Sequence, residues 1–282
     1  MSQRILVCTD LDRTLLPNGK QPESRDARRR FARLAAHEGV VLAYVTGRHL
    51  ALVDKAITNY VLPRPDYVSA DVGTSLYESR DDCWHRREDW DDEFSADWGS
   101  MDHTSIRLLF TDVIDLSLQE AAKQSRYKIS FYVPMYSDKH ALLPEMQRRL
   151  EKHNVKASLI WSIDDPAGIA LLDVVPASAT KFHAVEFLMR REGFAPENSV
   201  FAGDSGNDLP VLSSSLRTVL VANAAEEVRE EALHLSATRG TSDSLYLARG
   251  DFLGMNGNYS AGILEGVAHF LPETLAWMDG SN

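Results

Sequence analysis

Two stretches of the chain alternate short apolar segments with amphipathic ones, and this alternation constrains the fold more than any other feature. Near the N-terminus, Ile5–Thr9 and Val40–Val45 have the apolar composition of strands that are buried on both faces of a parallel sheet. The segment between them, 24–39, places apolar side chains at helical spacing and ends at a glycine. Because the connections are short, this β-α-β pattern predicts a right-handed crossover in a parallel sheet.

The same alternation returns late in the chain. A helix is predicted at Lys181–Glu192, strands at 199–202 and 219–222, and a closing helix at 263–271. The middle of the chain has a different pattern, with predicted strands at 106–110, 128–133 and 158–161 and predicted helices at 116–124 and 142–153. We therefore expect an α/β protein with a Rossmann-like, doubly wound parallel sheet as its core, formed by residues 1–78 and 174–282, and an inserted smaller α+β domain at residues 79–173.

The charge of the chain argues against a nucleic-acid partner. The 282 residues include 30 Lys and Arg and 41 Asp and Glu, which give a formal net charge of −11 at pH 7. Such a chain is poorly suited to hold nucleic acid or an anionic membrane by counterion release. The acid excess is concentrated at residues 78–97, which hold nine acidic residues and three arginines. The sequence does not specify the role of this acidic segment.

Cysteine content and hydropathy favour a cytoplasmic protein. Cys8 and Cys83 are the two cysteines of the chain, too few for a disulfide framework, and neither has the spacing of a metal site. The apolar stretch near the N-terminus is too short for a signal peptide, and no later run reaches the ~18 apolar residues of a membrane span. We expect neither a membrane nor a nucleic-acid partner, and the sequence does not specify an oligomeric state.

Two acidic residues follow the first predicted strand. Asp10 and Asp12 are two positions apart, so in an extended chain they face the same side while Leu11 points into the core. In open α/β sheets, ligands bind at the carboxyl ends of the strands, which is where this pair lies. A pair of acids in this pattern is equally compatible with a solvated turn, so the pair alone does not define a site.

Other predicted strands end in matching chemistry. Thr46, Gly47 and Arg48 follow the second strand, where a hydroxyl and a glycine amide near a helix N-terminus can hold a phosphate. The sequence GDSGND follows the strand at 199–202, and Lys181 opens the helix just before that strand. Each residue taken singly could be a helix cap, a surface charge or a turn residue. Together, at the ends of successive strands, they predict one site.

The chemistry that fits this set is phosphoryl transfer through an aspartyl phosphate. Mg²⁺ uses few protein oxygens, which suits Asp10, the backbone carbonyl of Asp12, and Asp204. Lys181 is expected to neutralise negative charge, while Thr46 and the amide of Gly47 bind phosphate oxygens. Asp12 is placed to protonate the leaving alkoxide and then to deprotonate the attacking water.

The four motifs DLDRT, VTGR, Lys181 and GDSGND occur in the order of the haloacid dehalogenase superfamily of phosphohydrolases, which this chain resembles. The segment between VTGR and Lys181 is similar to the cap domain that selects the substrate in that superfamily. Further stretches are similar to sucrose-phosphate phosphatases and their bacterial relatives, which include mannosylfructose-phosphate and kanosamine-phosphate phosphatases. These stretches are DVGTSLY at 71–77, RYKISFY at 126–132, VLVANA at 219–224 and SAGILEGVAHF at 260–270.

The resemblance implies a role for each matching residue. It implies that Asp10 is the nucleophile, that Asp12 is the acid and base, and that Asp204 is the second metal carboxylate. The other implied site residues are Thr46 and Lys181 as phosphate ligands, Asn207 and Asp208 as groups that orient phosphate, lysine or metal-bound water, and Thr14 as a supporting residue of the first motif. The chain departs from the family pattern at Arg13, where a small or amide residue is common, and in the length of its acidic segment at 78–97.

Candidate sugar-binding residues are expected in the inserted domain. Lys128, Ser130 and Tyr132 alternate along a predicted strand, so one face of that strand carries all three, while Ile129 and Phe131 are left for packing. An exposed polar sheet face is an equally good interpretation of this pattern. Arg48 and Asp71 are further candidates, although each could be a helix-end or turn residue.

The sequence thus favours an Mg²⁺-dependent phosphatase that hydrolyses a sugar phosphate, with sucrose 6-phosphate as the first candidate. Mannosylfructose phosphate, kanosamine 6-phosphate and a hexose phosphate are alternative substrates. A phosphomutase and a non-catalytic sugar-phosphate-binding protein are alternative functions. A phosphate-sensing receiver module also groups acids, a Thr and a Lys, but receivers of about 120 residues carry the acid pair and the phosphoacceptor on different strands.

Overall fold

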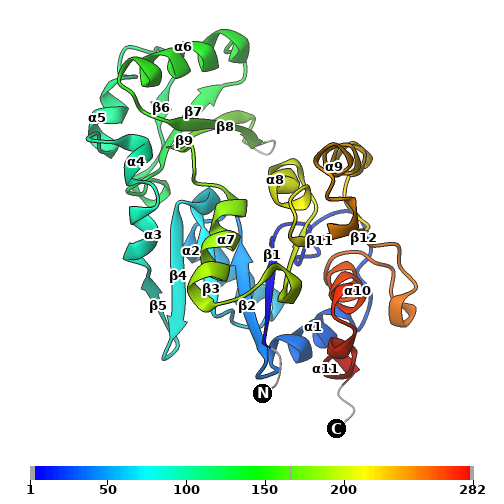
Figure 1. Ribbon diagram of the computed structural model, residues 1–282. Helices are drawn as coiled ribbons and strands as arrows, with labels where there is room; N and C mark the ends of the chain where they lie inside the picture. The colour runs from blue at the N-terminus through cyan, green and yellow to red at the C-terminus, as the bar shows by residue number, and fades with distance from the viewer. Residues whose placement is uncertain (1–3, 165–166, 280–282) are drawn as a thin grey trace. The chain divides into compact units, whose positions relative to one another are not determined.

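The computed structural model describes residues 4–164 and 167–279, which form two compact units (Figure 1). The core unit comprises residues 4–85 and 181–279, and the inserted unit comprises residues 86–164 and 167–180. Among the described residues, no helix has both the length and the apolar composition that crossing a bilayer requires.

The core unit is built on an eight-stranded sheet with the order β12-β11-β10-β1-β2-β3-β4-β5. Its strands are β1 (Ile5–Thr9), β2 (Val40–Val45), β3 (Tyr67–Ala70), β4 (Ser75–Arg80), β5 (Cys83–Arg86), β10 (Ser199–Gly203), β11 (Arg217–Leu220) and β12 (Leu245–Leu247). Neighbouring strands from β12 through β3 pair in parallel, and β4 pairs antiparallel with β3. The predicted strand at 219–222 begins and ends two residues earlier in the structure, as β11.

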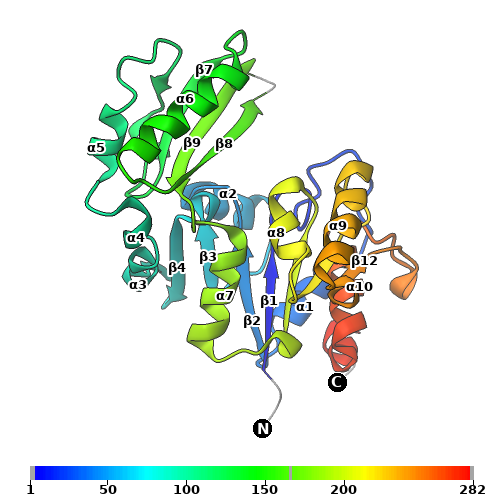
Figure 2. The same cartoon turned by 45° about the horizontal axis from the view of Figure 1, so that its top comes forward.

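Helices pack against both faces of this sheet. They are α1 (Ala27–Ala35), α2 (Leu50–Tyr60), α7 (Lys181–Glu192), α8 (Leu209–Leu212), α9 (Glu226–Arg239), α10 (Ser260–Phe270) and α11 (Leu275–Asp279). Ile5 and Val7 of β1 belong to one buried cluster with α1, α2 and α10, while Leu6 and Cys8 are buried on the opposite face. Figure 2 shows α7 and α8, which contact β2 and β10 respectively, in front of the sheet. The expected doubly wound α/β fold is confirmed.

Short 3₁₀ helices connect several of these elements. They are η1 (Asp71–Gly73), η2 (Ala121–Lys123), η3 (Pro196–Asn198), η4 (Gly206–Asp208), η5 (Ser242–Ser244), η6 (Phe252–Gly254) and η7 (Pro272–Thr274). Of these, η4 shapes the loop between β10 and α8, which carries the fourth motif.

The inserted unit contains a four-stranded antiparallel sheet with the order β6-β7-β9-β8. Its strands are β6 (Ser117–Leu118), β7 (Ile129–Pro134), β8 (Ala157–Asp164) and β9 (Ile169–Pro176), and its helices are α3 (Glu88–Asp92), α4 (Ser95–Trp98), α5 (His103–Leu108) and α6 (Lys139–Lys152). The predictions at 128–133, 142–153 and 158–161 correspond to β7, α6 and β8. Strand β9 was not predicted, although its buried residues alternate at Ala170, Leu172 and Val174.

Two predictions in the inserted unit are wrong. The predicted strand at 106–110 is helical over most of its length. Ile106 and Phe110 are buried four residues apart, which is the spacing of one helix face. The Asp102 side chain also caps α5, because it accepts a bond from the backbone amide of Ser105 (2.8 Å). The predicted helix at 116–124 contains β6 and η2 instead, because its backbone bonds to β7: the amide of Gln119 donates to the carbonyl of Ser130 (2.9 Å).

Candidate active site

A cavity of about 400 Å³ opens at the carboxyl ends of β1, β2 and β10 in the core unit. Its lining combines acids, arginines and loop residues from three of the four motifs. The lining residues are Asp10, Asp12, Arg13, Gly47, Arg48, Leu52, Asp204, Ser205 and Asn207. The parallel pairing of β1 with β2 and β10 brings these distant motifs to one edge of the sheet.

The acid pair after β1 is arranged as its spacing predicts. Asp10 and Asp12 both line the cavity, while Leu11 between them is buried in the core. Asp10 is also buried, and its backbone amide donates to the carbonyl of Ala202 on β10 (2.9 Å). The backbone of Asp10 is therefore anchored at the junction of β1 and β10.

Lys181 and Asp208 form a buried charge cluster with Asp10. The Nζ atom of Lys181 lies 3.0 Å from Oδ1 of Asp10 and 2.7 Å from Oδ1 of Asp208, and it donates a longer bond to Asn207 (3.1 Å). All three charged residues are at most 5% exposed. Although burial lowers the pKa of Lys181, the two neighbouring carboxylates raise it above its ordinary value. The lysine therefore stays charged at neutral pH.

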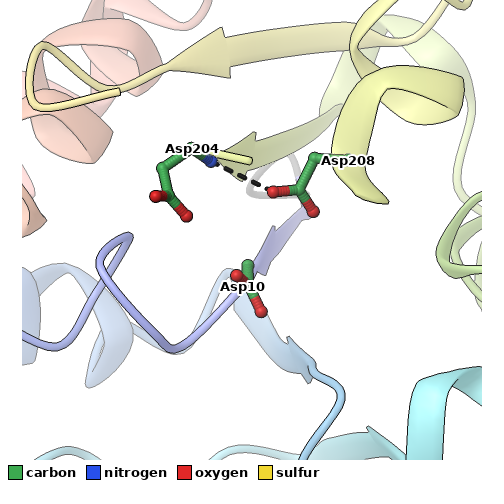
Figure 3. Close-up of side chains that lie close together, drawn as sticks. All are labelled: Asp10, Asp204 and Asp208. Atoms are coloured by element: carbon green, nitrogen blue, oxygen red, sulfur yellow. Dashed lines mark hydrogen bonds between the residues drawn. The ribbon is translucent and has the colours of Figure 1, made fainter. Parts of the chain in front are cut away.

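Asp204 follows β10 and faces the same region, as Figure 3 shows together with Asp10 and Asp208. The hydroxyl of Thr14 donates to its Oδ1 atom (2.9 Å), and Nε of Arg13 lies 3.5 Å from its Oδ2 atom. Thr14, expected as a supporting residue, thus links the first motif to the fourth.

Negative charge is in excess in this cluster. Burial raises the pKa of Asp10 to about 7 and that of Asp204 to about 6, and the charge of Asp208 adds to both rises. Lys181 opposes the rise at Asp10 but does not cancel it. A bound cation would relieve this excess.

The carboxylates fit a hard divalent cation. One oxygen from each of Asp10, Asp204 and Asp208 lies within 4.8 Å of the others. Asp208 is already engaged, because it accepts bonds from Lys181 and from the amides of Asp204 and Ser205. Asp10 and Asp204 are thus the residues whose side chains would hold Mg²⁺, and Asp208 supports the lysine and the loop.

The carboxylate of Asp12 has a different environment. The guanidinium of Arg48 donates to both oxygens of Asp12 (2.7 and 2.6 Å), and the side-chain amide of Asn18 donates to its Oδ1 atom (2.7 Å). Although partial burial raises the pKa of Asp12, the hydrogen bonds and charge of Arg48 outweigh it and hold this pKa below its usual value. In this structure Asp12 is a carboxylate oriented by an arginine.

The segment after β2 contributes Gly47 and Arg48 to the cavity, whereas Thr46 is buried and does not line it. The hydroxyl oxygen of Thr46 accepts a bond from the amide of Arg48 (3.2 Å), which shapes the turn before α2. Asp71 is buried outside the cavity lining, and its amide donates to the carbonyl of Arg48 (2.9 Å). Asp71 therefore supports the turn that carries Arg48.

The sequence model of the sucrose-6F-phosphate phosphohydrolase family matches residues 3–271. The chain belongs to this family. Its membership confirms the resemblance to sugar phosphatases of the haloacid dehalogenase superfamily.

Relatives with curated names agree with this assignment. A putative haloacid-dehalogenase-like hydrolase of Nitrosococcus oceani is 53% identical over 279 residues, which cover 99% of this chain and 75% of that protein. Sucrose-phosphatase 1 of Nicotiana tabacum is 29% identical over 80% of this chain, which spans only 52% of the plant protein. Mannosylfructose-phosphate phosphatase of Agrobacterium fabrum is 28% identical over 79% of this chain and 85% of its own length.

Solved structures of the superfamily share the fold. The sucrose-phosphatase of Synechocystis, in complex with sucrose and phosphate, has a TM-score of 0.69 at 23% identity, over 95% of this chain and 98% of its own. A haloacid dehalogenase-like hydrolase of Bacillus subtilis has a TM-score of 0.66 at 15% identity, over 95% and 92% of the two chains.

Two asparagines that contact the first motif are not indicated by the sequence patterns. Asn18 donates to Asp12 and accepts a bond from the amide of Arg13 (2.8 Å). Asn223 donates to the carbonyl of Arg13 (2.6 Å) and accepts from the amide of Tyr259 (2.8 Å). Asn223 lies within the VLVANA segment at 219–224, whose local pattern does not indicate a contact with a residue 210 positions away.

The three polar residues proposed for sugar binding lie in the inserted unit. Lys128 and Ser130 are buried beside Asp173: the Ser130 hydroxyl donates to its Oδ1 (2.5 Å) and Nζ of Lys128 is 3.7 Å from its Oδ2. The hydroxyl of Tyr132 donates to Glu120 (2.9 Å). Ile129 and Phe131 are buried, as their expected packing role requires.

Proposed function

We propose that this protein hydrolyses a sugar phosphate through a phosphoryl group carried by Asp10, with Mg²⁺ as its cation and sucrose 6-phosphate as the first candidate substrate. The observation that carries the proposal is the meeting of Asp10, Asp204 and Lys181 beside a cavity at the strand ends. In this arrangement Asp10 is a buried nucleophile, Asp10 and Asp204 offer carboxylate oxygens to a cation, and Lys181 offsets the charge of the phosphate.

In the first step, a carboxylate oxygen of Asp10 attacks phosphorus, and the bond from phosphorus to the sugar oxygen breaks. The departing sugar oxygen takes a proton from Asp12. In the second step, water attacks the phosphorus of the acyl phosphate and gives a proton to Asp12, while the bond from phosphorus to the carboxylate oxygen of Asp10 breaks. This step releases inorganic phosphate and restores both carboxyl groups to their starting state.

The charges at the site support these two reaction steps. Lys181 is held 3.0 Å from Asp10, so it can contact the phosphoryl oxygens next to the nucleophile. When bound, Mg²⁺ would offset the negative charges of the phosphate and of the carboxylates. Gly47 lines the cavity with its backbone, and Asn207 holds Lys181 through its amide oxygen.

Asp12 must carry a proton in the first step, yet Arg48 holds its pKa below the usual value. Arg48 is only partly buried and lines the cavity beside Asp12. A substrate phosphate dianion would attract the guanidinium and weaken its bonds to Asp12, which would raise the pKa of that carboxyl. We therefore assign Arg48 the role of linking substrate binding to the protonation of Asp12.

The names of the relatives support a substrate class. Relatives named as sucrose-phosphatases and as a mannosylfructose-phosphate phosphatase act, by those names, on disaccharide phosphates. We propose a disaccharide phosphate here, and we propose that the inserted unit is the cap that recognises the sugar, with Lys128, Ser130 and Tyr132 as candidate contacts. Kanosamine 6-phosphate and hexose phosphates are the competing substrates.

Phosphate release from a panel of sugar phosphates tests this function. The panel contains sucrose 6-phosphate, mannosylfructose phosphate, kanosamine 6-phosphate and glucose 6-phosphate, each with Mg²⁺ or with excess chelator. We expect the highest kcat/KM for a disaccharide phosphate, loss of activity with chelator, and loss in the variant Asp10→Asn. The variant Asp243→Asn, which changes an exposed carboxylate outside the cavity, is the matched control and should stay active. Activity in Asp10→Asn equal to that of the control would refute the proposal.

A further inference from the structure

Arg13 departs from the common composition of the first motif, and its backbone is held in an unusual conformation. Its φ angle is +59°, in the left-handed region that costs a residue with a large side chain about 1–2 kcal/mol. Two asparagines fix this conformation: the amide of Arg13 donates to Asn18 (2.8 Å), and its carbonyl accepts a bond from Asn223 (2.6 Å). The base of the arginine side chain is therefore fixed in the lining of the cavity.

The side chain of Arg13 is directed to the metal-binding carboxylate. Its Nε atom lies 3.5 Å from Oδ2 of Asp204, and Nη2 donates a long bond to the carbonyl of Asn223 (3.5 Å). The other oxygen of Asp204 accepts the hydroxyl hydrogen of Thr14 (2.9 Å). One oxygen of this buried carboxylate thus accepts a hydrogen bond, and the other lies within ion-pair distance of Arg13.

The cations of the site are divided among the carboxylates. Lys181 neutralises the cluster of Asp10 and Asp208, and Arg48 pairs with Asp12. Within residues 4–164 and 167–279, Arg13 is the cationic side chain paired with Asp204. The three cations differ in exposure: the side chain of Arg13 is 47% exposed, against 23% for Arg48 and 3% for Lys181. Arg13 is therefore the cation that can turn into solvent at the lowest cost.

We propose that Arg13 is a resident counter-ion of Asp204 that competes with the divalent cation. When no cation is bound, the guanidinium partly neutralises Asp204, and binding of the cation displaces it toward solvent. This competition lowers the affinity of the site for its metal. The inference rests on the proposed cation site, but it concerns metal affinity and not turnover.

The experiment measures metal binding in the 282-residue chain without substrate. Mn²⁺ binding followed by electron paramagnetic resonance, and Mg²⁺ binding followed by calorimetry, give dissociation constants for the wild type and for Arg13→Asn, Arg13→Lys and Lys55→Gln. Asn tolerates the left-handed backbone and removes the charge. Arg13→Lys retains the charge, and Lys55→Gln removes an exposed charge from α2.

We expect Arg13→Asn to bind both cations about three- to tenfold more tightly than the wild type, because a positive charge beside the ligand is lost. Arg13→Lys and Lys55→Gln should stay within about twofold of the wild type. The rise in Tm on adding Mg²⁺ should also be larger in Arg13→Asn, because a tighter ligand stabilises the folded state more.

Three results would overturn the inference. Unchanged or weaker binding by folded Arg13→Asn would show that the arginine does not compete. A similar tightening in Lys55→Gln would assign the effect to net charge and not to Arg13. Absence of binding by the wild type would remove the cation site itself and the proposed function with it, whereas the first two results leave the proposed function intact.

Discussion

The buried lysine of the site should stabilise the fold as well as serve catalysis. Lys181 is 4% exposed and lies between the carboxylates of Asp10 and Asp208, at 3.0 and 2.7 Å. Its replacement by Met leaves two buried carboxylates without their cation. Removal of one partner from a buried ion pair costs about 3–5 kcal/mol, against a total stability of about 5–15 kcal/mol. We therefore expect Lys181→Met to lose about 3–5 kcal/mol at pH 7.5.

The same reasoning predicts that this loss depends on pH. The pKa of Asp10 is already raised to about 7 with the lysine present, and it should rise further without it. An acid whose pKa is raised by folding stabilises the folded state at low pH and loses that contribution as pH increases through the raised value. At pH 5.5 the variant can protonate the carboxyl, so the loss should fall to about half of its value at pH 7.5.

Urea unfolding followed by circular dichroism, with chelator at both pH values, measures these differences. Lys55→Met is the matched control, because Lys55 is exposed on α2, and it should change stability by less than about 0.5 kcal/mol. A loss below about 1 kcal/mol in Lys181→Met, or a loss that is as large at pH 5.5 as at pH 7.5, would refute this account of the charge cluster.

Three further predictions concern the same site. A Cβ atom at Gly203 would lie 2.6 Å from the carboxyl group of Asp208, so Gly203→Ala should destabilise the core unit by about 1–3 kcal/mol and lower kcat. Gly206→Ala is the control: the added methyl group meets open space, so stability and kcat should stay unchanged. Burial raises the pKa of Asp204 to about 6, so protonation of this carboxyl stabilises the folded state at low pH. The Tm of the metal-free wild type should therefore increase as pH falls from 7.5 to 5, and the Tm of Asp204→Asn should increase less. An equal increase in both proteins would contradict this assignment. Arg48→Lys cannot make the two parallel bonds that the guanidinium makes, so its pH–rate profile should shift while its Tm changes by less than 3 °C, and an unshifted profile would rule out the proposed link to protonation.

The core fold and the motif positions could be predicted because they follow from local patterns. Strands buried on both faces of a parallel sheet must be apolar, so Ile5–Thr9 and Val40–Val45 were recognisable as strands. Parallel pairing then brings Asp10 and Asp204 to one edge of the sheet, since Thr9 is opposite Ala202 in the register. The order of the motifs and the parallel topology were together enough to predict that Asp10 and Asp204 lie close to each other.

The parts that could not be predicted depend on tertiary contacts. The apolar run at 106–110 is short enough to fit a strand or a helix, and only its packing through Ile106 and Phe110 decides for the helix. Likewise, the contact of Asn223 with Arg13 joins residues that are 210 positions apart, and no spacing rule connects them. The pairing of Asp12 with Arg48 also depends on side-chain geometry that the motifs do not specify.

The most direct test of the account is the location of the transferred phosphoryl group. The variant Asp12→Asn lacks the base for the second step, but p-nitrophenyl phosphate has a leaving group that needs no proton in the first. After incubation of this variant with that substrate and Mg²⁺, rapid acid quench and peptide mass spectrometry should find one added phosphoryl group on Asp10, and none in Asp10→Asn treated in the same way. A phosphoryl group on another residue, or continued turnover in Asp10→Asn, would contradict the claim that Asp10 is the nucleophile.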